Sequence, residues 1–424
     1  MLKFFKKVWK NEFFLGGIFL TSSSYAGHLM NYIFSFLTGR TLGPQGYAEI
    51  VTLFSYTLIA TVPISVLSTF LIQKISSAQR NQNLYVLTLE NLFWQKIKRW
   101  WLMIIPFIAI TPFLPSITNL SALASWSLLP LIILSLLATF YGAALQGLKL
   151  FLAISLIGIV ATFLKLMGAV SVILGIDGIA TIIFFLIFSN LFLFYASCSV
   201  ITRFLQKATK TKPKYINKRI VEVFKNKQFI IIFASTLALT LFNNIDIVVV
   251  KKFFTSHEAG IYASWSLFAK IILYFLSPLI SISFVFFASN KHSNSQTRTL
   301  HLSLALLFAV GLVSFLFYTY SGTFIINSLF GKKFIGVVQY LSQASIFGTL
   351  YAGISFINSY FLAKNSIFAL ILPICIPIYI VFLFFLPKQI DNVIRLDIIF
   401  SIFVLLLYFL GYLKSYSYSN SKSS

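Results

Sequence analysis

Residues 178–202 read GIATIIFFLIFSNLFLFYASCSVIT, a run that contains no charged side chain. A transmembrane helix needs roughly 20 consecutive, mostly apolar residues, and this run reaches that length without interruption. A strand of a transmembrane barrel alternates apolar and polar positions, whereas this run is continuously apolar. Open strands are excluded from lipid because their backbone groups lack hydrogen-bond partners there. The run is therefore predicted to form a membrane-spanning helix.

The same pattern recurs along the whole chain. Twelve candidate spans are predicted, at about 13–38, 47–72, 101–117, 121–145, 150–174, 178–202, 228–250, 259–288, 301–322, 335–362, 366–386 and 396–413. The third is the weakest, because Pro106, Pro112 and Pro115 interrupt it. The predicted fold class is an all-α integral membrane protein.

Composition excludes most other classes of protein. Hydrophobic residues make up 58% of the 424 residues, charged residues 10%, and the mean hydropathy is +0.91. A soluble domain has about 25% charged residues, so these figures argue against soluble, fibrous and disordered chains. The sequence contains no GxxxxGK(S/T), HExxH or GxSxG motif and no Cys/His cluster. No cofactor, metal site or catalytic residue is predicted, and the chain is not expected to be an enzyme.

The net charge of +24 indicates a membrane orientation. On a soluble protein it would suggest nucleic acid, but here most basic residues lie between apolar runs. With the N-terminus placed in the cytoplasm, 24 of the 33 Lys and Arg residues fall in predicted inner segments and seven in outer ones. This bias predicts cytoplasmic termini and an even number of spans, with no nucleic-acid partner. A signal peptide at the N-terminus is the alternative, although the apolar run resumes at 29–37.

An internal repeat with an offset of 215 residues is predicted. Landmarks that coincide at this offset are Tyr47-Ala48 with Tyr262-Ala263, Pro63 with Pro278, and Lys149 with Lys364. Two pseudo-symmetric halves are common in transporters, although chance alignment is the alternative. The predicted domains are an N-terminal six-helix bundle at 1–206, a basic cytoplasmic linker at 207–227 and a C-terminal six-helix bundle at 228–424.

Two predicted spans carry polar stripes. The first contains Thr21, Ser24, His28, Asn31, Ser35 and Thr38, and the seventh contains Thr236, Thr240, Asn243 and Asp246. Spacings of three and four residues place each set on one helical face, which must contact protein or water. The stripes either line a hydrated cavity or join helices through hydrogen bonds. The His, Asn and Asp side chains favour the cavity, with His28, Asn31, Asn243 and Asp246 as its candidate residues.

Two lysines lie inside predicted spans, Lys165 in the fifth and Lys270 in the eighth. They are candidate cationic contacts for a phosphate or an acidic sugar. An ion pair with Asp246 is an equal alternative for Lys270, and snorkelling along the helix is open to both lysines. Arg40 and Glu49 are expected to pair at the outer mouth.

Four short segments resemble one known family. They are GRTLGPQGYA at 39–48, DIVVVKKFF at 246–254, EAGIYA at 258–263 and LFGKKF at 329–334. Together, and in this order, they resemble the polysaccharide-biosynthesis, O-antigen-type flippases of the MOP exporter superfamily. The resemblance covers nearly the whole chain, since length, twelve spans and doubled halves also agree.

The resemblance implies two six-helix bundles in a V around a central cavity. It further implies alternating access for an undecaprenyl-diphosphate-linked oligosaccharide at the bacterial inner membrane. His28, Lys165 and Lys270 are then the candidate contacts of the diphosphate. Expected partners are the lipid-linked oligosaccharide, membrane lipids, and the polysaccharide polymerase and glycosyltransferases of the pathway. The alternatives are a drug/cation antiporter of the MATE type and a membrane polysaccharide polymerase.

Overall fold

The computed structural model describes residues 12–78, 82–100, 104–176, 178–208, 227–288 and 293–420. These residues form α-helices and short 3-10 helices, and no strand occurs among them. Ten of the described helices are long and apolar enough to cross a membrane. The predicted class, an all-α multi-pass membrane protein, is therefore confirmed.

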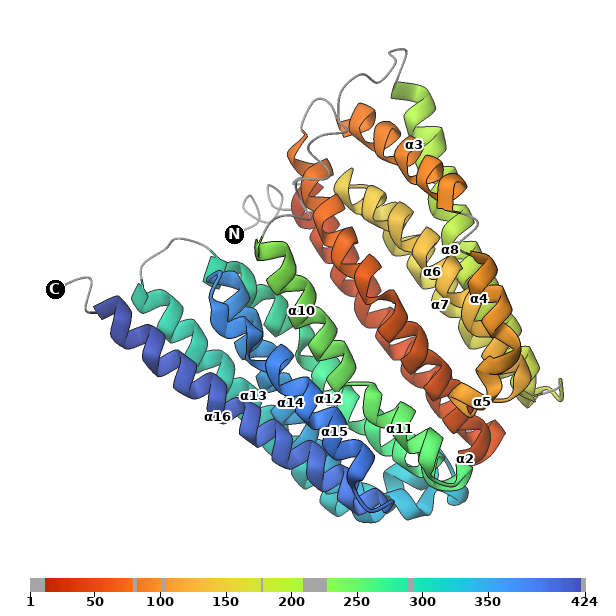
Figure 1. Cartoon of the computed structure of the whole chain (residues 1–424), viewed down its shortest axis with the longest axis vertical. Helices are drawn as coiled ribbons and strands as arrows, with labels where there is room; N and C mark the ends of the chain where they lie inside the picture. The colour runs from red at the N-terminus through yellow and green to blue at the C-terminus, as the bar shows by residue number, and fades with distance from the viewer. Residues whose placement is uncertain are drawn as a thin grey trace, which may run out of the picture. The chain divides into compact units, whose positions relative to one another are not determined.

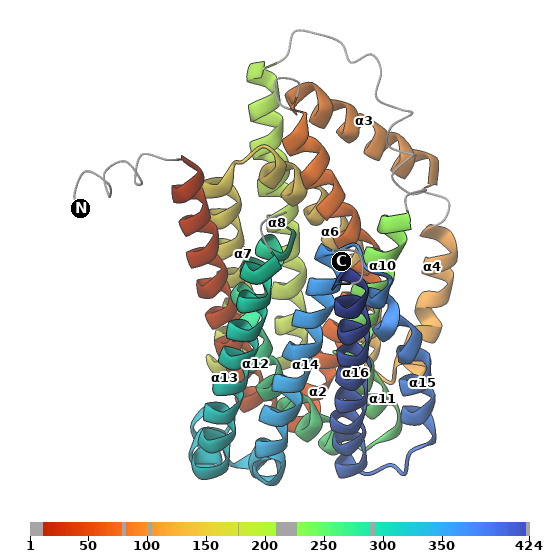
Figure 2. The ribbon, with the colours of Figure 1, turned by 90° about the vertical axis from the view of Figure 1, so that its left-hand side faces the viewer.

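Helix α2 (Glu12–Ser77) contains the first two predicted spans. It is broken at Gly43, whose φ of 68° is a left-handed conformation that glycine adopts at little cost. The early part of α2 contacts the start of α7, where Ser23 donates to Ser155 over 3.0 Å. The end of α2 contacts the end of α6, where Ser76 reaches the Gly147 carbonyl over 3.4 Å. Since α6 and α7 meet at one short turn, α2 is a hairpin of two spans (Figure 2).

The third predicted span differs from a regular membrane helix. After residue 103 the chain forms α4 (Ile104–Ile110), η3 (Thr111–Phe113) and α5 (Leu114–Thr118). The apolar helical stretch there, Ile108–Thr118, is too short to count among the ten spanning helices. Prolines near the starts of η3 and α5 divide it, because proline has no N–H to donate within a helix.

The chain folds into two compact units, and each is described by itself. Unit 1 comprises residues 1–42 and 56–225, and unit 2 comprises residues 43–55 and 226–424. Residues 209–226 of the predicted linker lie outside the described residues. The domain boundaries expected from the sequence stay a prediction.

Unit 1 is built on three neighbouring spans (Figure 1). In addition to most of α2 and to α4, η3 and α5, it holds α3 (Gln82–Trp100), α6 (Ala122–Gly147), α7 (Phe151–Ile173) and α8 (Gly178–Ala208). Helices α6, α7 and α8 pack against one another. A Cβ at Gly168 would lie 2.8 Å from Cβ of Phe185, so the glycine permits the close approach of α7 and α8.

Unit 2 is organised around α14, which packs against α12, α13 and α16 (Figure 2). Its elements are α10 (Lys227–Phe242), α11 (Ile245–Phe253), α12 (Ser256–Ala288), α13 (Ser293–Leu329), η4 (Lys332–Tyr340), α14 (Leu341–Ala363), η5 (Ile367–Leu370), α15 (Ile371–Phe385) and α16 (Ile390–Asn420). A Cβ at Gly348 would lie 2.4 Å from the Ala269 carbonyl oxygen, so α12 and α14 touch backbone to backbone.

Parts of three of the four segments that resemble the flippase family meet inside unit 2, namely residues 43–48, 258–263 and 329–334. The ring of Tyr47 packs edge-on against Phe330 and Phe334, with centroids 5.3 and 5.9 Å away. A Cβ at Gly260 would lie 2.1 Å from the carbonyl oxygen of Pro44, which leaves space only for glycine. Residues 43–48, 258–263 and 329–334 therefore pack together in one core of unit 2.

The turns after α6 and α14 have the same backbone conformation. Lys149 (φ 62°) and Asn365 (φ 52°) both adopt the left-handed conformation. Leu150 N–H donates to Leu145 over 2.9 Å, and Ser366 N–H donates to Phe361 over 2.9 Å. Both turns thus end a helix with the same left-handed capping pattern. The equivalent of Lys149 is Asn365 rather than Lys364, an offset one residue longer than the predicted one.

Candidate functional site

In unit 1, Lys165 on α7 contacts Asn31 on α2. Its ammonium Nζ donates to Asn31 Oδ1 over 2.8 Å and lies 4.5 Å from the ring centroid of Phe34. Asn31 Nδ2 donates to the Gly27 carbonyl over 2.9 Å, which turns Oδ1 toward the lysine. Asn31 and Lys165 are half-buried. These contacts hold the Lys165 ammonium group within the span. The Asn31 amide and the Phe34 ring that contact it carry no net charge.

The predicted stripe of the first span changes its surroundings along the helix. Thr21 and Ser24 are exposed, His28 and Asn31 are half-buried, and Thr38 is fully buried. His28 Nε2 lies 3.4 Å from Ser24 Oγ, one helical turn away. The middle of the stripe is thus half-buried, and Asn31 is its member that is bonded to Lys165.

In unit 2, the seventh predicted span is broken in its middle. Helix α10 ends at Phe242 and α11 begins at Ile245, with Asn243 and Asn244 between them. Asn244 is 2% exposed, and its Nδ2 donates to the Thr240 carbonyl over 2.9 Å. The N–H groups of Asn243 and Asn244 still donate to the Leu239 and Leu241 carbonyls, each over 3.1 Å, so the break is a local kink in one span.

Lys270 on α12 reaches this break. Its Nζ donates to Asn244 Oδ1 over 3.3 Å, and the lysine is half-buried. Each unit therefore holds one lysine within a span that donates to an asparagine amide. Because an amide is neutral, the hydrogen bond orients the ammonium group without cancelling its charge.

Two buried acids of unit 2 share a tyrosine. The Tyr262 hydroxyl lies 2.6 Å from Asp246 Oδ2 and 2.7 Å from Asp397 Oδ2. Tyr379 donates to the other oxygen of Asp397 over 2.6 Å. Asp246 and Asp397 are 1% and 0% exposed.

The hydrogen bonds of these residues require that one of the two carboxyl groups is protonated. A phenol has one hydrogen to donate, and an ionised carboxylate only accepts. Tyr262 can therefore donate to one acid only, and the second acid must donate its own proton to the Tyr262 oxygen. We refer to Asp246, Tyr262, Tyr379 and Asp397 as the acid–tyrosine cluster.

The structure shows contacts that bear on both alternatives for Lys270, the anion contact and the ion pair with Asp246. Lys270 and Asp246 interact electrostatically. The Lys270 hydrogen bond nevertheless goes to Asn244, and that of Asp246 Oδ2 goes to Tyr262. Asp246 is thus bonded within the acid–tyrosine cluster and interacts with Lys270 through its charge. Asn243, its neighbour on the predicted stripe, is half-buried.

The two residues expected at the outer mouth lie in different units. Arg40 is exposed in unit 1, and Glu49 is 8% exposed in unit 2. Within unit 2, Glu49 interacts electrostatically with Lys251, which is 5% exposed and donates to Ser256 Oγ over 3.3 Å. The predicted binding roles of all eight site residues stay predictions.

Sequence reasoning missed Asn244, Tyr379 and Asp397. Asp397 could have been found, because it is an acid within the predicted span 396–413, and such residues are costly in lipid. Tyr262 was used only as a landmark of the repeat. Asn244 lies beside the predicted stripe, and only the break between α10 and α11 directs it toward Lys270.

Comparison with known proteins identifies the fold. No protein-family model and no curated protein matches the chain. An inward-facing MATE-family multidrug resistance transporter of the MOP superfamily has a TM-score of 0.67 at 14% identity, covering 96% of this chain and 99% of its own. The lipid II flippase MurJ has a TM-score of 0.61 at 17% identity, covering 94% and 87%. A MOP superfamily transporter from Pyrococcus furiosus has a TM-score of 0.54 at 11% identity, covering 93% and 95%.

These neighbours share their fold with this chain over nearly its full length. They are transporters and flippases of the MOP superfamily, as the resemblance of the short segments implied. At identities of 11–17% the likeness concerns the fold.

Proposed function

We propose that this chain is a flippase for an undecaprenyl-diphosphate-linked oligosaccharide, such as an O-antigen or capsule repeat unit. It would act by alternating access in the bacterial inner membrane, with both termini in the cytoplasm, and would make or break no bond. The observation that carries the proposal is the pair of intramembrane lysines, Lys165 and Lys270, each held by an asparagine amide. The glycosyltransferases and polymerase of the same pathway would supply and consume the cargo.

The diphosphate is the part of the cargo that needs these cations. Inserting a charged lysine at the centre of a span costs at least ~2.5–3.5 kcal/mol of free energy. Such a residue is therefore expected to have a functional role. The amides of Asn31 and Asn244 orient the two ammonium groups and leave their positive charge in place. An ammonium group in that state suits a phosphate oxygen, with which it forms short, charge-assisted hydrogen bonds.

The oligosaccharide needs a polar route, and the stripe of the first span provides hydrogen-bonding groups. Its half-buried members include His28 and Asn31, about one turn apart, and Asn31 is bonded to Lys165. Sugar hydroxyl groups both donate and accept, as these side chains do. The polyprenyl tail would remain in the bilayer, because apolar chains lose their favourable environment in a polar passage.

A drug/cation antiporter has the same fold and is the alternative. A cationic cargo requires accessible acids, but Asp246 and Asp397 are 1% and 0% exposed and bonded to tyrosines. The half-buried groups next to the polar stripe are instead lysines. This difference in accessibility between acids and bases favours an anionic cargo.

Deletion of the gene tests the proposal in cells. Lipid-linked oligosaccharides should accumulate on the cytoplasmic side, and the wild-type chain should restore export. A deletion strain with no accumulation and a raised sensitivity to cationic drugs would favour the antiporter.

A further inference from the structure

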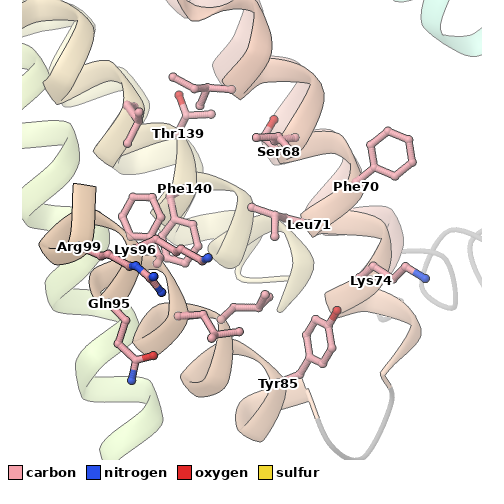
Figure 3. A pocket seen from close by; sticks show the side chains of 16 residues that line it. Ser68, Phe70, Leu71, Lys74, Tyr85, Gln95, Lys96, Arg99, Thr139 and Phe140 are labelled. Carbon is pink, nitrogen blue, oxygen red and sulfur yellow. The ribbon is translucent and has the colours of Figure 1, made fainter. Parts of the chain in front are cut away.

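A groove in unit 1 has no role in the proposed transport site. It lies between the second part of α2, α3 and α6 and encloses about 790 Å³ (Figure 3). Most of its lining is apolar, and Lys74, Lys96 and Arg99 are its basic residues. It includes neither Asn31 nor Lys165. The groove is therefore an apolar surface with basic residues among its lining.

Helix α3 is fixed in place beside this groove. Trp94 Nε1 donates to the Tyr141 hydroxyl over 3.0 Å, and Tyr141 donates to Glu90 over 2.7 Å. The rings of Phe93 and Phe140 stack with centroids 4.1 Å apart and planes 4° from parallel. These contacts tie α3 to α6, so the groove is a built feature of unit 1.

One face of α3 changes from apolar to cationic along its length. Tyr85, Leu89, Leu92, Lys96 and Arg99 line the groove at spacings of four, three, four and three residues, which places them on one helical face. Figure 3 shows the Lys96 and Arg99 side chains close together at one side of the groove. Both are exposed, and neither forms an ion pair with a residue that the structure describes.

The apolar walls run along the last part of α2 and of α6. The contact between Ser76 and Gly147 marks where α2 and α6 end together. Ile64 and Leu136, which also line the groove, lie 12 and 11 residues before those ends. At ~1.5 Å per residue this is roughly 17–18 Å. The Phe93–Phe140 stack and the Trp94–Tyr141 hydrogen bond place the stretch of α3 just before Lys96 and Arg99 beside residues 140 and 141 of α6, between Leu136 and that end.

We propose that this groove binds one anionic phospholipid of the surrounding bilayer, with its phosphate at Lys96 and Arg99 and an acyl chain along Ile64 and Leu136. Two adjacent cations complement the phosphate charge, and the apolar walls suit an acyl chain. Burial in the groove raises the pKa of the Tyr85 phenol, which fits a sheltered, low-dielectric channel. The phospholipid would hold α3 against α2 and α6 at the headgroup level.

Native mass spectrometry of the purified full-length chain, titrated with phosphatidylglycerol, tests this site. Lys96→Gln and Arg99→Gln should each raise the Kd of the first bound lipid about fivefold, because one basic group is lost. Lys98→Gln is the matched control, since Lys98 is exposed on the same helix but does not line the groove. Ser68→Phe should reduce binding by filling the groove, with the melting temperature confirming that each variant folds.

Three outcomes would overturn the proposal. The first is an equal loss of binding in Lys98→Gln. The second is equal affinity of the wild-type chain for phosphatidylcholine and phosphatidylglycerol. The third is displacement of phosphatidylglycerol by undecaprenyl diphosphate in the wild type but not in Lys96→Gln, which would assign the groove to the transported lipid.

Discussion

Lys165 Nζ and Asn31 Oδ1 lie 2.8 Å apart, joining α7 to α2 inside the bilayer segment of unit 1. The bond fixes an ammonium group beside the polar stripe of the first span. Its partner is an amide, which positions the ammonium group without neutralising it. An acid at position 31 would do both. The amide positions the lysine, and in the proposed mechanism the positive charge binds the diphosphate.

Asn31→Asp tests this role of the charge directly. The new carboxylate would pair with Lys165 at the same distance and compete with an anionic cargo, so export should fall at least about tenfold. Stability should be retained, because the buried charges are paired. The measurement is export of surface polysaccharide together with the melting temperature of the purified variant.

Asn190→Asp is the matched control for this change. Asn190 is a half-buried residue of α8 in the same unit, and its amide contacts Ser135 and the Leu186 carbonyl. The described contacts of Asn190 include no lysine, so a carboxylate at this position would have no cation to pair with. The change should therefore lower the melting temperature. Full export by Asn31→Asp would show that the charge of Lys165 is not used.

The acid–tyrosine cluster yields a prediction about stability. Tyr262→Phe removes the hydroxyl between two buried carboxyl groups, which should cost about 1–3 kcal/mol for each polar group left unsatisfied. Asp397→Asn should be far milder, because an amide can donate to Tyr262 as a protonated acid does. Thermal unfolding in detergent measures both. Equal destabilisation by the two changes would argue against a shared proton.

Thiol labelling tests which polar residues are accessible. In a chain carrying Cys198→Ser and Cys375→Ser, cysteines at Asn31 and Asn243 should react with a small membrane-impermeant reagent, because both positions are half-buried. A cysteine at Asp246 should be protected, since that side chain is 1% exposed. Protection at all three positions would indicate that the stripes are helix contacts.

A reporter fused at Lys212 tests the orientation. Lys212 lies outside the described residues, in the basic segment predicted to be cytoplasmic. An enzyme active only in the cytoplasm should be active there, because basic segments remain on that side. An active periplasmic reporter at the same position would reverse the topology.

The sequence predicted the helical class and most spans, because long apolar runs carry that information directly. It could not show that residues 43–55 fold with unit 2, since that depends on Tyr47 packing against Phe330 and Phe334. Periodicity likewise did not show that residues 104–118 divide into short helices. There the position of each proline within its turn decides the outcome.

The site was predicted in part. Asn31 and Lys165 were singled out separately by stripe and charge, and the structure joins them by a hydrogen bond. Asp246 was placed on the polar stripe, but the break before α11 turns it toward Tyr262. Its partner Asp397 lies 151 residues further along the chain, and no local pattern connects two residues so far apart.

Transport by the purified chain tests the central claim most directly. Proteoliposomes would contain a fluorescent undecaprenyl-diphosphate-linked oligosaccharide. A membrane-impermeant reductant added outside quenches each fluorophore that reaches the outer leaflet, so the loss of fluorescence measures flipping. With the wild-type chain, the inner-leaflet fluorophore should be quenched well above the rate of protein-free liposomes. Lys165→Ala should reduce that rate at least about tenfold, since a hydrogen bond to a charged group contributes about 1.5–3 kcal/mol. Lys332→Ala, which changes an exposed lysine outside the polar stripes, should flip at the wild-type rate. A wild-type rate equal to that of empty liposomes, or an unchanged rate in Lys165→Ala, would contradict the account.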